Sequence, residues 1–455
     1  MSSAESPTAI RRTPPVGSIR GTINAAGMTL LAVLTAFILG GLIIWITSGQ
    51  FDTVLKAYGG LADGALFKQR GLSESLIAST PYILAGLAVA VGFKAGLFNI
   101  GAEGQFYIGA MGAVWVGYTF AGLPAIVHLP LALFLGAACA ALWAAIPGYL
   151  KARTGAHEVI TTMMMNYIAF RLTEYMVSNL MKDQAASIPK TPDVAANAEL
   201  WRFWQMPERL KDPLNALAAA LVIGLVAFFL ARWITGLPRL CHRFGSDRRR
   251  RIMVYGFGIL VGFITFFALP ALTQAWWPFV DNKDRLHIGL LLAIAMAVLV
   301  WWLLARTTIG FELRTIGANP AAARYSGINV SRNIVLAMAI SGALAGLAGA
   351  VEILGLEHNL PISFSSGYGW DSIAIALVAQ NDPFGIVLAA FMFGGMRNGA
   401  DLMELRSGVS KYVISLIQAL MLLFVATPAM IRWIYRLPTE RRPEEEAPLT
   451  RGWGG

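Results

Sequence analysis

The sequence has little charge, almost no cysteine and none of the common nucleotide-binding or hydrolase motifs. Only 14% of its 455 residues are charged, whereas a soluble domain carries about 25%. Two cysteines, Cys139 and Cys241, support neither a disulfide framework nor a metal cluster. G-x-x-x-x-G-K-[ST], H-E-x-x-H and G-x-S-x-G are all missing, and the five histidines are scattered. We therefore predict no catalytic residue, no metal site, no bound cofactor and no ATP binding through a phosphate-binding loop.

What the sequence does have is long apolar runs flanked by basic residues. Hydrophobic residues make up 56% of the chain, and the mean hydropathy is +0.60. The net charge of +10 could suggest nucleic acid as a partner. However, the basic residues lie beside apolar segments, which the positive-inside rule explains more simply. We therefore predict a membrane protein in contact with lipid and not with nucleic acid.

The apolar runs predict an all-α integral membrane protein, a polytopic bundle of about 10–12 transmembrane helices with broken helices. A helix needs about 20 apolar residues to cross a bilayer. The segments 371–380 and 384–400 are short by this measure and are candidate half-helices. The apolar runs lie at 28–47, 74–92, 103–119, 130–149, 157–180, 213–234, 252–277, 287–305, 333–355, 371–380, 384–400 and 411–430.

The loop charges predict that both termini are cytoplasmic, in a multi-pass protein of the bacterial plasma (inner) membrane. Loops assigned to the inside are basic, as at 248–251, whereas 120–129 and 356–370 contain no Lys or Arg. The external loop 181–212 has five basic residues and weakens this contrast. The expected division is a disordered tail (1–26), a transmembrane domain (27–430) and a second cytoplasmic tail (431–455).

The stretch 306–332 is a charged loop between two apolar segments and is expected to be ordered. Asn319 can cap a helix, Pro320 suits its first position, and Gly327 can close its end. An ordered helical loop beside a membrane favours docking on another protein. A solvated linker is the alternative.

Two interruptions of helical continuity mark where a solute could pass. VGFKAGLFNIGAEGQ (91–105) contains four glycines and an asparagine, and Glu103 and Gln105 open the next helix. Broken helices at membrane depth line cavities or are buried in protein. A short cytoplasmic turn with a capping Glu103 is the alternative here. The second interruption is Gln380–Pro383, and paired breaks point to a transporter's central site.

Three further patterns concern helix faces. Glu158, Thr162 and Asn166 share one face of 157–180, and Arg171 with Glu174 forms an i,i+3 pair that should face the bundle or water. The aromatic residues Phe364, Tyr368 and Trp370, followed by Asp371, suit a planar or sugar-like ligand, although interfacial anchoring explains them as well. Small residues four apart predict a tight helix bundle: Gly109, Ala113, Gly117, Gly342 and Gly346.

Four blocks of the sequence resemble the permease subunits of bacterial ATP-binding cassette importers that serve branched-chain amino acids, simple sugars and nucleosides. The resemblance is strongest to the nucleoside and simple-sugar branch and covers most of 28–180 and 286–430. The blocks are GFKAGLFNIGAEGQFYIGA (92–110), HEVITTMMMNYIA (157–169), HIGLLLAIAMAVLVWWLLARTTIGFELRTIGANPAAARYSGI (287–328) and SGALAGLAGA (341–350). The segment 181–285 departs from the family through a longer loop and an extra helical hairpin around 238–251.

The resemblance implies a homo- or heterodimer of permease subunits, cytosolic ATP-binding subunits that hold ATP and magnesium, and an extracytoplasmic substrate-binding protein. It also implies that 306–331 is the coupling loop that docks on the ATPase, through Glu312, Arg314, Gly317, Asn319 and Pro320. We expect the substrate pathway to include residues of the breaks and of the aromatic patch. These are Phe98, Asn99, Glu103, Gln105, Asn166, Tyr368, Trp370 and Asp371.

The sequence thus predicts a permease subunit that imports a small polar solute, a nucleoside or a simple sugar, with ATP hydrolysed on a partner. Two alternatives remain. The first is an ion-coupled secondary transporter with Glu103, Arg171 and Asp371 as relays. The second is a membrane enzyme, against which the missing catalytic motifs argue.

Overall fold

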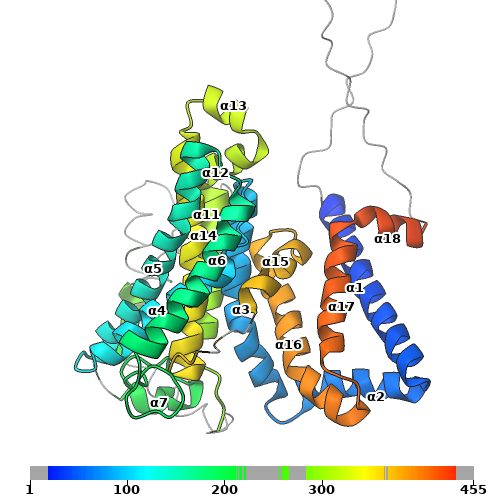
Figure 1. Cartoon of the computed structure of the whole chain (residues 1–455), viewed down its shortest axis with the longest axis horizontal. Helices are drawn as coiled ribbons and strands as arrows, with labels where there is room; N and C mark the ends of the chain where they lie inside the picture. Colours follow the sequence, from blue (N-terminus) through cyan, green and yellow to red (C-terminus); the bar gives the residue numbers. More distant parts are fainter. Residues whose placement is uncertain are drawn as a thin grey trace, which may run out of the picture. The chain divides into compact units, whose positions relative to one another are not determined.

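A computed structural model describes residues 19–211 and 283–436, except Ser363, Ser365 and Ser366, together with scattered residues between 213 and 265. The chain divides into two compact units, one of Met1–Leu55 with Val409–Gly455 and one of Lys56–Gly408. The described secondary structure is helical, apart from two isolated bridges between loop residues (Figure 1). The prediction of an all-α polytopic membrane protein is confirmed. Residues 19–26 of the tail predicted to be disordered are helical, because α1 begins at Ile19. The rest of that tail, most of 431–455 and the extra hairpin around 238–251 lie outside the described residues.

The smaller unit is a helical pair with a bend. Helix α1 (Ile19–Ser48) packs against α17 (Tyr412–Ala426). At Thr427 the chain turns by 92° into α18 (Pro428–Ile434), because Pro428 can begin a helix but cannot continue the preceding one. The hydroxyl groups of Thr35 and Tyr435 lie 2.9 Å apart and join α1 to the residue after α18.

Five helices in the described part of the chain are long and apolar enough to cross a membrane. They are 27–48 of α1, α3 (Gly71–Lys94), α5 (Ala125–Thr154), α11 (Gly289–Arg306) and α14 with its extension (Val330–Glu357). The bent pair of α17 and α18 makes a sixth if it counts as one span. Length and composition thus confirm several spans, while the predicted total of 10–12 stays a prediction.

The larger unit is built around α3, α4 (Ala102–Thr119), α5 and α14, which pack against one another. At the crossing of α4 and α14, Gly109 lies against the backbone of Gly346, so that a Cβ atom on Gly109 would overlap it. Gly342 likewise has no room for a side chain beside Ala140 and Ala144 of α5. The predicted tight packing through small residues is confirmed.

Both predicted breaks are present. Residues 95–101 separate α3 from α4, and 379–382 separate α15 (Tyr368–Val378) from α16 (Pro383–Ser407). At the second break Gln380 and Asn381 have φ values of 53° and 57°, and the Asp382 side chain caps α16 by accepting from the Gly385 amide. The 11-residue α15 is short, as expected. The expectation of a half-helix at 384–400 is wrong, since α16 has 25 residues and ends at Ser407.

The loop after α6 (Glu158–Tyr175) forms a strap, which we define as residues 181–211. Backbone bonds tie it to the segment that follows α14: the amides of Thr191, Val194 and Leu200 donate to the carbonyl groups of Leu360, His358 and Leu354. A hydrogen bond from Lys190 lowers the pKa of Asp193, which also accepts from Asn359. The strap contains α7 (Met206–Arg209), and Figure 1 places α7 and α13 (Pro320–Tyr325) at opposite ends of the larger unit. This agrees with the assignment of the two loops to opposite sides of the membrane.

The α4–α14 crossing generates a stability prediction. Gly109→Ala should lower the free energy of unfolding by about 1–3 kcal/mol, because the added methyl forces two helix backbones apart. Thermal unfolding of the purified protein in detergent would show this as a lower Tm. Gly122→Ala is the matched control, since a Cβ there meets nothing within 4 Å. Equal Tm values for the two variants would contradict the close approach.

Candidate functional site

The break between α3 and α4 is held by a buried network of amide side chains. Asn99 donates from Nδ2 to Gln105 Oε1 and to Ser341 Oγ, each at 2.8 Å, and its Oδ1 accepts from the Gly101 amide at 3.0 Å. Ser341, on α14, donates in turn to the Ala88 carbonyl oxygen of α3 at 2.6 Å. These bonds replace the helical ones that the break removes.

Asn166 ties α6 to the same break. Its Oδ1 accepts from the Gly104 amide at 2.8 Å, and its Nδ2 donates to the Ile100 carbonyl oxygen at 2.9 Å. Asn166 and Thr162 are buried, and Glu158 pairs with Lys151 at 2.8 Å, so the face of α6 that these three residues share packs into the larger unit. The structure brings together three residues predicted for the pathway, Asn99, Gln105 and Asn166, and gives them partners within the chain.

Glu103 joins the N-terminal ends of two helices. It lies in the first turn of α4, has no exposed surface, and accepts from the Gly369 amide in the first turn of α15 at 2.6 Å. The partial positive charge of a helix N-terminus stabilises a carboxylate at such a position. Its second oxygen, Oε1, is buried and has no hydrogen-bond partner among the described residues. This carboxylate is therefore only partly satisfied by hydrogen bonds within the described structure.

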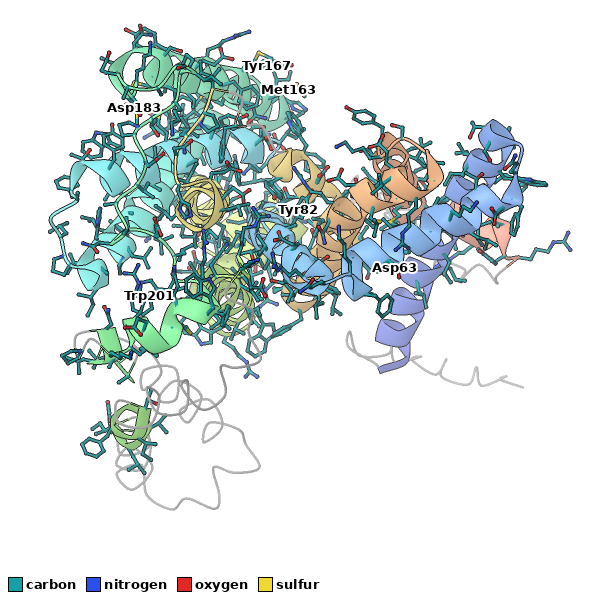
Figure 2. All side chains as sticks on the ribbon, turned by 90° about the horizontal axis from the view of Figure 1, so that it is seen from below. Asp63, Tyr82, Met163, Tyr167, Asp183 and Trp201 are labelled. Atoms are coloured by element: carbon teal, nitrogen blue, oxygen red, sulfur yellow. The ribbon has the colours of Figure 1, made fainter. Side chains whose placement is uncertain are left out.

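A cluster of tyrosine and charged side chains lies on α3, α14, α15 and α16, with Tyr82 labelled in Figure 2. The Tyr82 hydroxyl donates to Asp371 Oδ2 at 2.6 Å and accepts from Arg397 Nη1 at 3.0 Å. The Arg397 guanidinium lies over the ring of Tyr368, 4.5 Å from Cζ to the centroid. The Tyr368 hydroxyl is hydrogen-bonded to Glu352. We call Tyr82, Glu352, Tyr368, Asp371 and Arg397 the central cluster.

Aromatic rings connect the central cluster to Glu103. The Tyr82 and Tyr368 rings meet edge to face with centroids 4.7 Å apart. Phe106 lies one turn beyond Glu103 on α4. The centroid of its ring is 5.7 Å from that of Tyr368, and the ring stacks on Phe364 with centroids 5.5 Å apart. Flat apolar faces, hydrogen-bonding carboxylates and one guanidinium thus gather in one region, and such a combination binds polar ring compounds.

The structure sorts the remaining pathway predictions. Tyr368 and Asp371 belong to the central cluster, whereas Trp370 and Phe98 are 41% and 37% exposed. Sequence reasoning missed Tyr82, Glu352 and Arg397. A signal was present for two of them, because Glu352 and Arg397 interrupt apolar runs, and an ionisable residue within a span marks a functional site.

The three residues predicted as relays of an ion-coupled transporter, Glu103, Arg171 and Asp371, do not form one cluster. The predicted pair of Arg171 with Glu174 is confirmed at 2.7 Å, but the Arg171 side chain is 83% exposed on α6 and does not face the bundle. Glu103 and Asp371, in contrast, are near each other in the core of the larger unit. No relay through Arg171 is seen in the described structure.

The predicted coupling loop folds as two helices, α12 (Thr308–Ala318) and α13. Asn319 caps α13 by accepting from the amides of Ala321 and Ala322, Pro320 is its first residue, and Gly327 follows with a φ of 80°. These three predictions are confirmed. Ala321, Ala322 and Arg324 are exposed and Tyr325 is 95% exposed, whereas Ala323 is buried. Glu312 accepts from Asn333 of α14 at 2.7 Å, which fastens α12 to the bundle.

A multi-pass helical bundle with two broken helices around a buried polar cluster and an exposed helical loop at one end has the architecture of a transport permease. The chain belongs to the family described as branched-chain amino acid transport system / permease component, whose model matches residues 71–426. It is therefore a membrane-embedded subunit of an importer and not an enzyme.

Several curated relatives cover nearly the whole chain. The guanosine ABC transporter permease protein of Bacillus subtilis is 37% identical over 89% of this chain and 95% of its own length. The glucose ABC transporter permease protein of Haloferax volcanii is 31% identical over 89% of this chain and 87% of its own length. The nucleoside ABC transporter permease protein of Lactococcus lactis is 29% identical over 88% of this chain and 91% of its own length. No solved structure matches the chain.

The network at the break generates a second prediction. Asn166→Ala leaves the Gly104 amide and the Ile100 carbonyl without their side-chain partner in a buried position, so unfolding should become easier by about 1–3 kcal/mol for each group. Asn179→Ala on the exposed end of the same helical stretch should stay within about 0.5 kcal/mol of the unchanged protein. Thermal unfolding in detergent measures both. A tolerated Asn166→Ala would show that the break does not depend on this side chain.

Proposed function

We propose that the chain forms the translocation pathway of an ATP-driven importer of nucleosides. The observation that carries the proposal is the buried, unsatisfied Oε1 of Glu103 beside the aromatic rings of the central cluster. The curated relatives named for guanosine and for nucleosides support this solute class.

The chemistry of a nucleoside complements this region. A nucleobase has a flat face, and stacking of a base on an aromatic side chain contributes about 1–3 kcal/mol. Ribose hydroxyls can donate to the carboxylates of Glu103, Glu352 and Asp371, and Arg397 can donate to an acceptor on the base. The proposed pathway residues remain Phe98, Asn99, Glu103, Gln105, Asn166, Tyr368, Trp370 and Asp371, now joined by Tyr82, Glu352 and Arg397.

A simple sugar is the second candidate solute. A pyranose ring offers hydroxyl donors for the same carboxylates and an apolar face for an aromatic ring. The curated glucose relative supports this candidate. The presence of several aromatic rings, rather than one, favours the nucleoside.

The energy source and partners complete the proposal. Without a phosphate-binding loop in this chain, ATP with magnesium is bound and hydrolysed on a separate cytosolic subunit. The exposed face of α13 is the proposed contact with that subunit, on the cytoplasmic side together with both chain termini. A second permease subunit completes the pathway, and an extracytoplasmic binding protein delivers the solute.

Reconstitution tests the solute and the energy source together. In proteoliposomes that contain the permease, its ATP-binding subunit and its binding protein, we expect uptake of radiolabelled guanosine that unlabelled adenosine or uridine reduces and unlabelled leucine does not. Uptake should stop when the ATP-binding subunit is inactivated by mutation. Uptake that persists without ATP hydrolysis would support ion coupling, and chemical conversion of the solute by the purified chain would support an enzyme.

Arg397 provides a test of the central cluster. Arg397→Lys keeps the positive charge but loses the planar group over Tyr368 and the fixed geometry toward Tyr82. Because a hydrogen bond from a charged donor to the solute contributes about 1.5–3 kcal/mol, apparent solute affinity in the uptake assay should fall by about tenfold or more when Arg397 no longer has its planar donor geometry. The matched control is Arg171→Lys on the exposed face of α6, which should leave uptake unchanged. Equal affinities in both variants would remove Arg397 from the site.

A further inference from the structure

Gly317, in the last turn of α12, lies against the end of α3 and away from the exposed face of α13. A Cβ atom at Gly317 would overlap the Lys94 carbonyl oxygen and lie 2.8 Å from the Gly96 nitrogen. A Cβ atom at Gly96 would lie 2.9 Å from Gly317 Cα. Gly96 also has a φ of 71°, which disfavours any residue with a side chain. Two backbones are thus in direct contact where only glycine fits.

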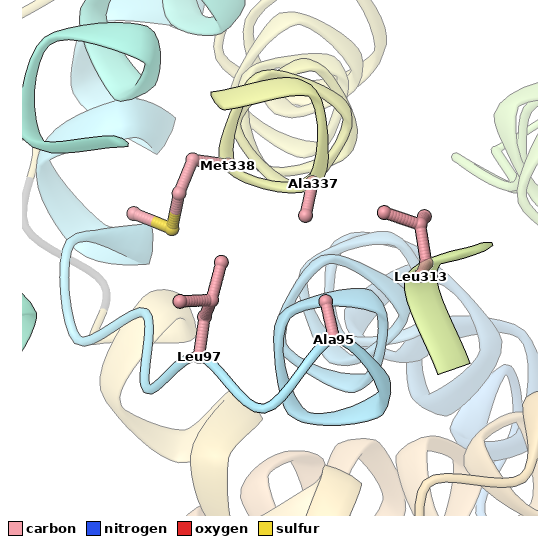
Figure 3. Packing of buried hydrophobic residues seen from close by; sticks show 5 residues of the cluster. All are labelled: Ala95, Leu97, Leu313, Ala337 and Met338. Carbon is pink, nitrogen blue, oxygen red and sulfur yellow. The ribbon is translucent and has the colours of Figure 1, made fainter. Parts of the chain in front are cut away.

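The chain neighbours of this contact belong to a small apolar cluster, whose five residues are labelled in Figure 3. Ala95 and Leu97 come from the start of the break, Leu313 from α12, and Ala337 and Met338 from α14. All five are buried, with Leu313 and Ala337 having no exposed surface. Close packing of this kind transmits displacement, because a well-packed interior has few voids to absorb it.

The turn 94–96, which contacts α12 through Gly96, continues directly into the break between α3 and α4. Within three residues the chain reaches Asn99, which is bonded to Ser341 and Gln105. Within seven it reaches Glu103, which accepts from Gly369 beside Tyr368 of the central cluster. From α12 to the central cluster, each step is therefore a backbone contact, a covalent segment or a buried hydrogen bond.

We propose that Gly317 and Gly96 form a joint through which α12 moves the broken segment beneath the solute site. Gly317 is then a positioning residue inside the permease, whereas its resemblance to a coupling motif assigns it to the contact with the ATPase. The contact of Glu312, near the middle of α12, with Asn333 fastens α12 to α14 as well. The inference rests on the proposed ATP-driven import.

A substitution in the joint should change the solute transported per ATP without changing affinity for the ATP-binding subunit, whereas a substitution in a docking residue should change both. Gly317→Ala fills the contact, although alanine favours a helix more than glycine does, so α12 itself should be retained. Leu97→Ala perturbs the same joint in the opposite sense by leaving a void. Ala322→Trp changes the exposed face of α13 and serves as the docking variant. Gly122→Ala, distant from all of these contacts and unobstructed, is the matched glycine control.

Each variant is assembled with the ATP-binding subunit and binding protein, and three quantities are measured: affinity for the ATP-binding subunit, ATP hydrolysis and solute uptake. For Gly317→Ala and Leu97→Ala we expect unchanged subunit affinity and a fall of about tenfold or more in solute transported per ATP, a size typical of coupling between two sites. Ala322→Trp should lose subunit affinity, and Gly122→Ala should match the unchanged complex.

Three results would overturn the joint: normal transport per ATP in Gly317→Ala, loss of subunit affinity in Gly317→Ala that matches Ala322→Trp, or normal coupling in Leu97→Ala. If Gly317→Ala does not assemble, Leu97→Ala decides. Failure of the unchanged complex to import solute with ATP would instead refute the proposed function, which keeps the two claims distinguishable.

Discussion

The structure depends on one constraint: backbone groups released by a broken helix need partners inside the protein, because lipid offers none. Between α3 and α4 the partners are the side chains of Asn99 and Asn166, supported by Gln105 and Ser341. They come from the break itself, α4, α6 and α14. The same bonds that satisfy the break therefore fix the relative positions of the helices around it, and the start of α4 is placed where Glu103 meets α15.

Burial makes the charged groups of the core depend on one another. A charge within a bundle is costly unless it is paired or hydrogen-bonded. Arg397 is balanced by a hydrogen bond to Tyr82 and by the face of Tyr368, and Asp371 accepts from the same tyrosine hydroxyl. Glu103 is only partly satisfied, since Oε1 has no partner among the described residues. In the proposed function, a polar solute would exchange its hydrogen bonds with water for hydrogen bonds with these groups.

Local features of this structure could be predicted from the sequence. The cap at Asn319, the break at 95–101 and the close approach of Gly109 follow from residue types whose backbone preferences act over a few positions. Contacts between distant residues could not. Arg397 and Tyr82 are 315 residues apart, and their meeting depends on the rotation and register of α16 against α3, which tertiary packing determines.

The length of α16 shows a further limit of reading hydropathy. Its apolar run ends near residue 400, which suggested a half-helix, yet the helix continues to Ser407. Hydropathy reports compatibility with lipid, whereas Leu402, Glu404 and Arg406 are all good helix formers regardless of their polarity. Arg406 also forms an ion pair with Asp63, which holds the polar end of α16 against the helix that precedes α3.

The two glycines at positions 96 and 317 connect these observations. A break that is held by side chains from several helices cannot shift alone, because its buried donors and acceptors would lose their partners. It can shift together with the turn 94–96, which contacts α12 through the backbones of Gly96 and Gly317 and packs beside it through Ala95. In the proposed joint, the change in position then appears at the far end of the segment, where Glu103 meets the first turn of α15. In this proposal, a rigid break rather than a flexible one allows a loop at one end of the larger unit to act on a buried cluster.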